Sequence, residues 1–282
     1  MVFAPFYSAE DISIYNADTV DFMKSIDDGS IDLTVTSPPY DALRDYTSES
    51  SWTWEKFQAV ALDLHRITKT GGAVVWNVTD QTHQGSESGS SFRQALFFME
   101  CGFKLADTMI YKKANPGGAR GSNKTYTQCF EYMFVLSKGD LKKHNLIKDR
   151  PNKRPGKQSG GGRRNKDSTI AKTTVYESEE FGRRFNIWEY ATQTDKFSGQ
   201  HPAPFPIKLA EDHIISWSDP GDMIFDPFSG SGTTMVAAWR QKRRGIGVDI
   251  SADYSELAEK RLKAEIELKN SLTYSWVTLP KV

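Results

Sequence analysis

The feature that most constrains the fold is a short apolar run that stops abruptly at two prolines. Ile31–Thr36 is rich in β-branched side chains and bounded by polar residues, which predicts a buried strand. Pro38 and Pro39 cannot continue this strand, because proline has no N–H and a fixed φ. The strand should therefore end in a stiff turn that presents Ser37 and Tyr40 at its carboxyl edge, where open α/β sheets bind their ligands.

Such a turn offers the groups needed to hold a planar ring that carries an exocyclic amine. The Ser37 hydroxyl and the backbone carbonyls can accept the two amine hydrogens, and the Tyr40 ring can stack on the planar ring. An ordinary surface turn after a strand would have the same composition. These residues alone do not decide between the two interpretations.

A second strand and turn occur much later in the chain. Met223–Asp226 is apolar enough for a strand, and Gly230 and Gly232 let the backbone after it approach a ligand closely. We expect Thr233 or Thr234 to cap the helix that follows this turn.

The next predicted strand, Gly245–Ile250, contains an acid near its end. In nucleotide-binding βαβ units, a carboxylate such as Asp249 binds both hydroxyls of a ribose. The dinucleotide fingerprint is incomplete, because Met235 stands where its third glycine would fall. The glycine turn, the downstream acid and the Ser-Pro-Pro-Tyr turn together indicate a ligand site far more strongly than any one of them.

With these motifs the chain resembles the DNA amino-methyltransferases, which use S-adenosylmethionine to methylate N4 of cytosine or N6 of adenine. Residues 37–40 resemble the catalytic motif of that family, and residues 226–232 resemble its cofactor loop. The catalytic motif comes first in the chain, which resembles the circularly permuted β class. The resemblance covers about residues 10 to 270 and is weakest in a basic middle segment.

The resemblance implies a fold and a set of site residues. The fold is α/β: a doubly wound, mostly parallel seven-stranded methyltransferase sheet with an antiparallel edge hairpin, circularly permuted, with an inserted basic target-recognition segment. The catalytic residues it implies are Ser37, Pro38, Pro39 and Tyr40. The cofactor-binding residues it implies are Asp18, Thr36, Pro204, Phe205, Asp226, Pro227, Phe228, Ser229, Gly230, Ser231, Gly232, Thr233, Thr234 and Asp249. It implies no metal.

Two further acids have roles that depend on their neighbours. Asp18 lies near the cofactor adenine in the family, but it also precedes an expected helix, Thr19–Ile26, and would suit its N-cap. Asp80 follows the predicted strand Ala73–Val78, and we expect it near the target base.

The overall composition gives no sign of a nucleic-acid partner, because 36 basic residues balance 36 acidic ones. The basic charge is local: between positions 142 and 173, eleven lysines and arginines face two aspartates. We expect this segment to neutralise DNA phosphates, and a disordered insertion without a specific role is the alternative. We accordingly divide the chain into a catalytic half (10–137), a basic target-recognition insertion (138–185), a cofactor-binding half (186–270) and a C-terminal tail (271–282).

The remaining features bear on the compartment and on one rival chemistry. Cys101 and Cys129 are too few for a disulfide framework, and the start of the chain lacks the pattern of a signal peptide. No apolar run is long enough to span a membrane, so we expect a cytoplasmic protein. Neither cysteine lies in a Pro-Cys turn, which argues against methylation at C5 of cytosine.

The resemblance implies site-specific methyl transfer to N4 of a cytosine flipped out of double-stranded DNA. A serine at the first catalytic position is typical of N4-cytosine enzymes, and an aspartate of N6-adenine enzymes. N6-adenine methylation by the same mechanism is the alternative, and an RNA target stays open. Two alternatives from other functional classes stay open: a non-catalytic DNA-binding subunit and a nicotinamide oxidoreductase. A homodimer and a partner restriction endonuclease are possible partners.

Overall fold

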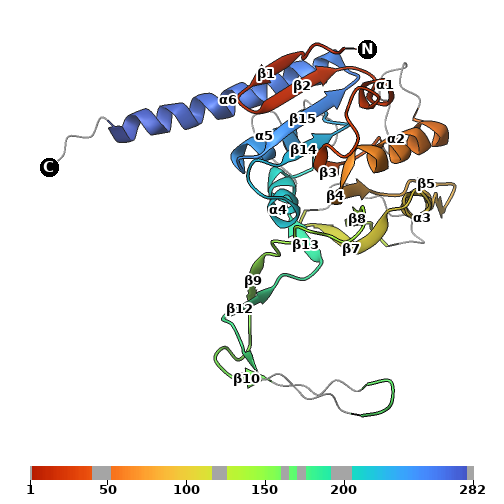
Figure 1. The fold of residues 1–282 in the computed structure, drawn as a ribbon, viewed down its shortest axis with the longest axis vertical. Helices are drawn as coiled ribbons and strands as arrows, with labels where there is room; N and C mark the ends of the chain where they lie inside the picture. The colour runs from red at the N-terminus through yellow and green to blue at the C-terminus, as the bar shows by residue number, and fades with distance from the viewer. Residues whose placement is uncertain are drawn as a thin grey trace. The chain divides into compact units, whose positions relative to one another are not determined.

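The structure is a computed structural model that describes residues 2–39, 52–115, 126–159, 165–169, 176–191 and 205–277. The chain forms two compact units, of which the smaller comprises Leu146–Phe185. The larger unit holds a nine-stranded sheet with the order β1-β2-β15-β14-β3-β4-β8-β7-β13 (Figure 1). Its strands are β1 Tyr7–Ala9, β2 Ile12–Asn16, β3 Ile31–Thr36, β4 Thr68–Val78, β7 Lys104–Lys113, β8 Phe130–Ser137, β13 Ile187–Tyr190, β14 Met223–Asp226 and β15 Arg244–Asp249.

Most of this sheet is parallel. Strands β2, β15, β14, β3 and β4 pair in parallel, whereas β8 is antiparallel to both β4 and β7. The predicted fold class, a mostly parallel α/β sheet with antiparallel strands, is therefore confirmed. Two short strands extend the seven that were predicted, since β1 lies at one edge and β13 pairs in parallel with β7 at the other. Of the antiparallel pair, β7 thus lies one place in from the edge and β8 two places in. Circular permutation stays a prediction.

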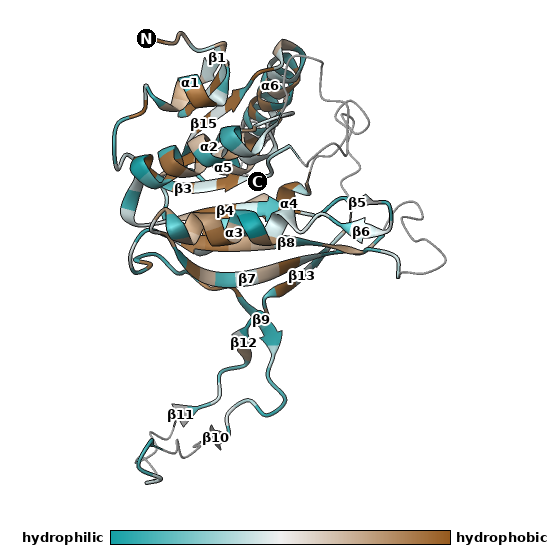
Figure 2. Ribbon diagram, turned by 90° about the vertical axis from the view of Figure 1, so that its right-hand side faces the viewer, coloured by the Kyte–Doolittle hydropathy of each residue, from teal (hydrophilic) through white to brown (hydrophobic). Residues whose placement is uncertain are grey.

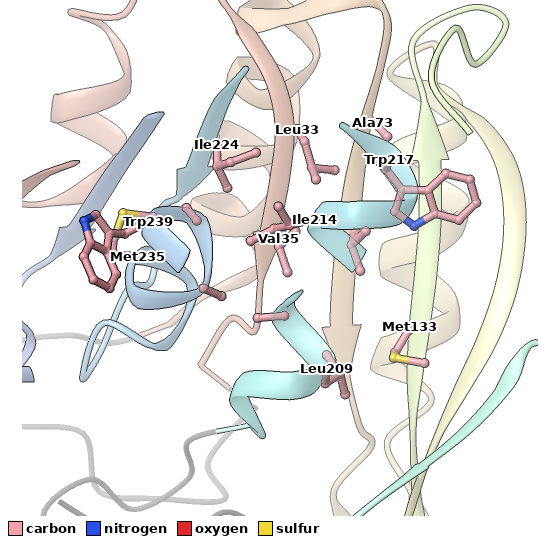
Figure 3. Packing of buried hydrophobic residues seen from close by; sticks show 14 of the residues in the cluster. Leu33, Val35, Ala73, Met133, Leu209, Ile214, Trp217, Ile224, Met235 and Trp239 are labelled. Carbon is pink, nitrogen blue, oxygen red and sulfur yellow. The ribbon is translucent and has the colours of Figure 1, made fainter. Parts of the chain in front are cut away.

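Helices cover both faces of the sheet, in the layered arrangement expected when apolar faces must be buried. One face is covered by α1, α2 and α3, and the other by α4, α5 and α6. Figure 3 shows the second face, where Ile214 of α4 lies beside Val35 of β3 and Met235 of α5 lies beside Trp239 of the same helix. The helices are α1 Thr19–Met23, α2 Trp54–Ile67, α3 Ser90–Glu100, α4 Ile207–Trp217, α5 Thr233–Arg240 and α6 Ala252–Val277. In the part of the chain that the structure describes, no helix is long and apolar enough to cross a membrane.

Helix α2 shows how the sequence specifies these elements. The Thr53 side chain accepts a hydrogen bond from the Lys56 backbone N–H at 3.3 Å, which caps the helix. A buried apolar stripe then follows the helical period through Phe57, Val60, Ala61, Leu64 and Ile67. The chain passes directly from this helix into β4, which places the end of β4 beside the end of β3.

The smaller unit is built from two short antiparallel strand pairs. Lys148–Pro151 (β9) pairs with Phe181–Arg183 (β12), and Gln158–Ser159 (β10) pairs with Tyr176–Glu177 (β11). The Arg184 N–H donates to the Ile147 carbonyl at 2.9 Å, so the two ends of the unit are held side by side. Its strand β9 is fully exposed and hydrophilic (Figure 2).

The smaller unit begins at Leu146, later than the boundary predicted at residue 138. Lys143 shows why, because its Nζ forms ion pairs with Asp32 and Asp222 of the larger unit. A lysine held by two carboxylates is part of the sheet's support rather than of a phosphate-binding surface. The functional division of the chain stays a prediction.

Candidate active site

Four neighbouring parallel strands bring the predicted site residues to one edge of the sheet. Strands β2, β15, β14 and β3 lie side by side in that order. Asp18 lies just beyond β2, Asp249 and Asp226 end β15 and β14, and Thr36 ends β3. Residues 37–39, called the catalytic turn below, and residues 226–232, called the cofactor loop, are far apart in the sequence. The order of the strands makes them neighbours in space.

A direct hydrogen bond joins the two motifs. The Thr36 hydroxyl donates to Oδ1 of Asp226 at 2.7 Å, and both side chains are buried. The Phe228 N–H donates to the same oxygen at 3.0 Å. Burial raises the pKa of Asp226 to about 6, although hydrogen bonds from Thr36 and Phe228 oppose the increase. The carboxyl is thus held at the junction of catalytic turn and cofactor loop.

Replacing Asp226 by Asn should change how stability depends on pH. The pKa of Asp226 is higher in the folded than in the unfolded chain, so the folded state binds more protons between about pH 4 and 6. The contribution of Asp226 to the free energy of unfolding therefore falls as the pH rises through that range. We expect Asp226→Asn to remove this fall and to raise the free energy of unfolding at pH 8 by on the order of 1–3 kcal/mol. Urea denaturation at pH 4 to 8 measures it, and an unchanged pH profile would contradict it.

The cofactor loop turns sharply into helix α5. Gly232 occupies the N-cap position with φ of +77°, and an added Cβ would lie 2.8 Å from the Ala258 Cβ. Only glycine suits both the backbone and the space. The prediction that Thr233 or Thr234 caps the helix is wrong, because both lie inside it. The Thr234 hydroxyl instead donates to the Val35 carbonyl, and Thr233 accepts from Arg261.

Asp249 is bound to the cofactor loop as well as positioned beside it. Its Oδ2 accepts the Gly230 N–H at 2.8 Å, and its Oδ1 accepts the Ser251 N–H at 2.9 Å. Burial raises the pKa of Asp249, and these two backbone hydrogen bonds oppose that increase. Each carboxylate oxygen has a second lone pair, so the group can still accept hydroxyl hydrogens from a ligand.

The residues around this loop fit an adenosyl cofactor. Ser229 Oγ is buried and has no hydrogen-bond partner within the described residues, which marks a polar atom that a ligand could satisfy. A Cβ at Gly247 would come within 2.6 Å of that oxygen, so glycine there keeps the space around Ser229 open. An unsatisfied hydroxyl and a carboxylate with spare acceptors suit a ligand with several hydroxyl and amino groups.

The other predicted cofactor-binding residues cap a helix, pack against neighbouring side chains or are buried in the loop. Asp18 caps α1, because its Oδ1 accepts from the Val20 N–H at 2.8 Å, and a role at the cofactor stays a prediction. The Phe228 ring packs edge-on against Trp52 at 5.1 Å, and Phe205 packs against the core beside α4. The remaining residues of the loop, Pro227 and Ser231, are buried, with the Ser231 carbonyl accepting from Arg261.

The catalytic turn is described in part. Ser37 and Pro39 are partly exposed and Pro38 is buried, directly after β3. Tyr40 and Pro204, both predicted site residues, lie outside the described residues. Asp80 accepts hydrogen bonds from Ser91 and Ser88 at the start of α3, and a contact with the target base stays a prediction.

Sequence reasoning missed one polar cluster at the same edge. Asn77 in β4 donates to Oε2 of Glu131 in β8 at 2.7 Å, and Lys113 at the end of β7 pairs with Oε1 of the same carboxylate at 2.7 Å. Asn77 and Glu131 are buried. The sequence feature that could have pointed to this cluster is Glu131, an acid at the beginning of an otherwise apolar strand. That feature alone does not reveal which residues Glu131 contacts.

Comparisons with known proteins agree with this geometry. Residues 31–260 match the family described as DNA methylase. The chain is 48% identical over 267 residues to the orphan methyltransferase M.BamHII of Bacillus amyloliquefaciens, covering 92% of this chain and 98% of that protein. It is 27% identical over 282 residues to the Type II methyltransferase M.ScaI of Streptomyces caespitosus, covering 93% and 85%.

Solved structures show the same fold. The PvuII DNA methyltransferase (cytosine-N4-specific) aligns with a TM-score of 0.69 at 20% identity, covering 95% of both chains. A putative DNA modification methylase of Thermus thermophilus, complexed with S-adenosyl-L-methionine, aligns with a TM-score of 0.59 at 22% identity, covering 90% and 95%. The resemblance carried by the two sequence motifs is confirmed. The chain therefore belongs to the DNA methylase family of N6-adenine and N4-cytosine methyltransferases, whose methyl donor is S-adenosylmethionine.

Proposed function

We propose that this protein transfers a methyl group from S-adenosylmethionine to N4 of a cytosine flipped out of double-stranded DNA, in the cytoplasm. The observation that carries the proposal is the 2.7 Å hydrogen bond between Thr36 and Asp226, which joins the catalytic turn to the cofactor loop. For direct transfer, the nitrogen of the amine and the methyl group of the donor must be in van der Waals contact and aligned. Adjacent motifs satisfy that requirement.

The order of strands suggests how the cofactor lies along the edge. Asp249 would bind the ribose hydroxyls, Asp18 would lie toward the adenine, and the loop 226–232 would surround the amino-acid end. S-adenosylmethionine would supply an electrophilic methyl group on a sulfonium, which leaves as a neutral thioether while the methylated amine gives up one proton. The chain's own task is then to hold the cofactor and the base in line and to exclude water, which needs positioning more than a strong base.

The catalytic turn would activate the amine. The lone pair of an exocyclic amine is delocalised into its ring, which makes the free base a poor nucleophile. The Ser37 hydroxyl and the Pro38 carbonyl accept the two amine hydrogens and draw the nitrogen toward sp³ geometry. Tyr40 would stack on the ring. No metal takes part in this scheme.

The choice of cytosine depends on Ser37. A carboxylate at this position would accept an amine hydrogen more strongly, because charged acceptors form stronger hydrogen bonds. A neutral serine is typical of the N4-cytosine members, and N6-adenine is the alternative within the same mechanism. A homodimer and a partner endonuclease stay predictions.

The product identifies the base directly. Purified protein, S-adenosylmethionine and unmodified duplex DNA should yield N4-methylcytosine after digestion to nucleosides and mass spectrometry. N6-methyladenine as the only product would contradict the cytosine assignment and leave the mechanism intact. The absence of any methylated nucleoside would contradict the enzymatic function, and a matched RNA duplex tests the choice of nucleic acid.

The smaller unit would supply contacts to DNA phosphates. Lys148 pairs with Glu179, and Arg184 pairs with Asp149. Within the described residues, by contrast, the exposed side chains of Lys153, Arg154 and Lys157 form no ion pair. Unpaired basic side chains can neutralise phosphates and release counterions.

Replacing these three residues by glutamine should therefore weaken DNA binding. We expect an affinity loss of about tenfold or more at low salt, and a slope of log affinity against log salt that is shallower by up to about 3. S-adenosylmethionine affinity should not change. Lys24, Lys104 and Lys260 of the larger unit are 64%, 61% and 65% exposed and each pairs with an acid, so their triple replacement is a control with the same change in net charge. Equal effects of the two triple variants on fluorescence-anisotropy titrations would contradict the assignment.

A further inference from the structure

The cluster of Asn77, Glu131 and Lys113 lies at the same edge of the sheet as the turn that follows β3. The pairing of β3 with β4 matches Val35 with Val75 and Thr36 with Trp76. Continued by one residue in both strands, this register places Ser37 beside Asn77. Leu33, Val35, Ala73 and Val75 alternate onto the face covered by α4 and α5, and Ser37 and Asn77 continue that alternation.

The Asn77 side chain is held in one orientation by its neighbours. Its Nδ2 donates to Glu131, and Glu131 is in turn paired with Lys113. An amide offers N–H donors on one side and a carbonyl acceptor on the other, so the partner of Nδ2 determines which group faces which way. The Glu131 side chain is 9% exposed and that of Lys113 is 30% exposed, so water competes weakly for the carboxylate.

We propose that Asn77 contacts the target base next to Ser37, and that Glu131 and Lys113 are positioning residues that hold the Asn77 amide. This proposal rests on the proposed function, because it concerns the base that Ser37 binds. In both cytosine and adenine, a ring nitrogen that accepts a hydrogen bond lies next to the carbon that bears the exocyclic amine. An oriented amide beside the serine would hold that ring edge while the amine is methylated. A loosely held amide would bind the base less exactly and slow the transfer.

The chain contains a comparable ion pair at the amino ends of the parallel strands, opposite the candidate site, which can serve as a control. Lys69 pairs with Asp32 at 2.6 Å, with side chains 40% and 8% exposed, near the start of β3. The Lys113–Glu131 pair has almost the same length and exposure but lies near the catalytic turn. Lys113→Met and Lys69→Met therefore each remove an ion pair of similar length and exposure, one near each end of the parallel strands, and Asp32 keeps its second pair with Lys143.

Both variants should stay folded at the assay temperature but differ in catalysis. We expect a kcat about tenfold lower for Lys113→Met and a kcat near the wild-type value for Lys69→Met, with melting curves to confirm that both are folded. The affinity for S-adenosylmethionine should be unchanged in both. Lys113→Arg keeps the charge and should retain about half or more of the wild-type kcat.

A double-mutant cycle tests whether Glu131 acts through Asn77. Glu131→Gln should lower kcat about tenfold in the wild-type background and have no further effect in Asn77→Ala. Equal kcat in Lys113→Met and Lys69→Met, or additive effects of Glu131→Gln and Asn77→Ala, would overturn the proposal while the proposed function stands. Wild-type protein that transfers no methyl group to DNA would overturn both.

Discussion

Ser37→Ala is expected to lower kcat for methyl transfer by about 100-fold, while the chain stays folded and binds S-adenosylmethionine normally. The variant removes one of the two acceptors for the amine hydrogens, so the nitrogen lone pair stays delocalised in the ring. Removing a single preorganised hydrogen-bonding group from an active site typically costs a factor of about 100 to 1,000, on the order of 3–4 kcal/mol. Because the turn keeps Pro38 and Pro39, its backbone should not move.

Single-turnover kinetics with tritiated S-adenosylmethionine and duplex DNA measure this loss. Ser30→Ala is the matched control, since Ser30 directly precedes the same strand at its other end and donates to the Asp27 carbonyl at 2.7 Å. We expect Ser30→Ala to leave kcat unchanged. A kcat of Ser37→Ala within twofold of wild type would remove the hydroxyl from the mechanism, whichever base is modified.

Asp249→Ala is expected to weaken S-adenosylmethionine binding by about 100-fold. Two hydrogen bonds from ribose hydroxyls to a carboxylate account for about 3 kcal/mol, which corresponds to that factor. Part of the loss has a second origin, because Asp249 also accepts the Gly230 N–H and thereby fixes the cofactor loop. Asp249→Asn keeps one acceptor oxygen and should lie between the alanine variant and wild type.

Calorimetric titration and a melting curve separate binding from folding. Asp253→Ala serves as the control, because Asp253 is an exposed acid in the first turn of α6. A normal melting curve with unchanged affinity in Asp249→Ala would place the ribose elsewhere. A second outcome is a reduced melting temperature together with a binding site that stays unoccupied even at high S-adenosylmethionine concentration. That outcome would mean that Asp249 only holds the cofactor loop in place and does not bind the ribose.

Much of the fold was predictable because its strands carry strong local signals. Ile31–Thr36 and Met223–Asp226 are apolar runs that end at proline or at a glycine turn, and each forms the predicted strand. Edge strand β1 was not predicted, since Tyr7–Ala9 is only three residues long and lacks an alternating pattern. Its pairing with β2 depends on contact across the turn rather than on its own composition.

The candidate site, like the fold, was predictable from the sequence only in part. The edge on which Asp226 and Thr36 meet followed from the resemblance and from parallel strand direction. The cap expected of Thr233 or Thr234 failed because a glycine with positive φ already ends the loop at position 232, which moves both threonines into the helix. The ties among Asn77, Glu131 and Lys113 could not be predicted, because they depend on the pairing of three strands rather than on spacing along the chain.

The way the smaller unit closes on itself has a consequence for how such proteins diversify. Strands β9 and β12 pair next to the points where the chain leaves and re-enters the larger unit, and the Arg184 N–H reaches Ile147 across that junction. A segment whose ends are clamped together by its own backbone can be shortened, lengthened or exchanged for another without pulling on β8 or β13. The smaller unit, which we propose as a contact to DNA, could therefore be exchanged without altering the strands that hold the predicted site residues.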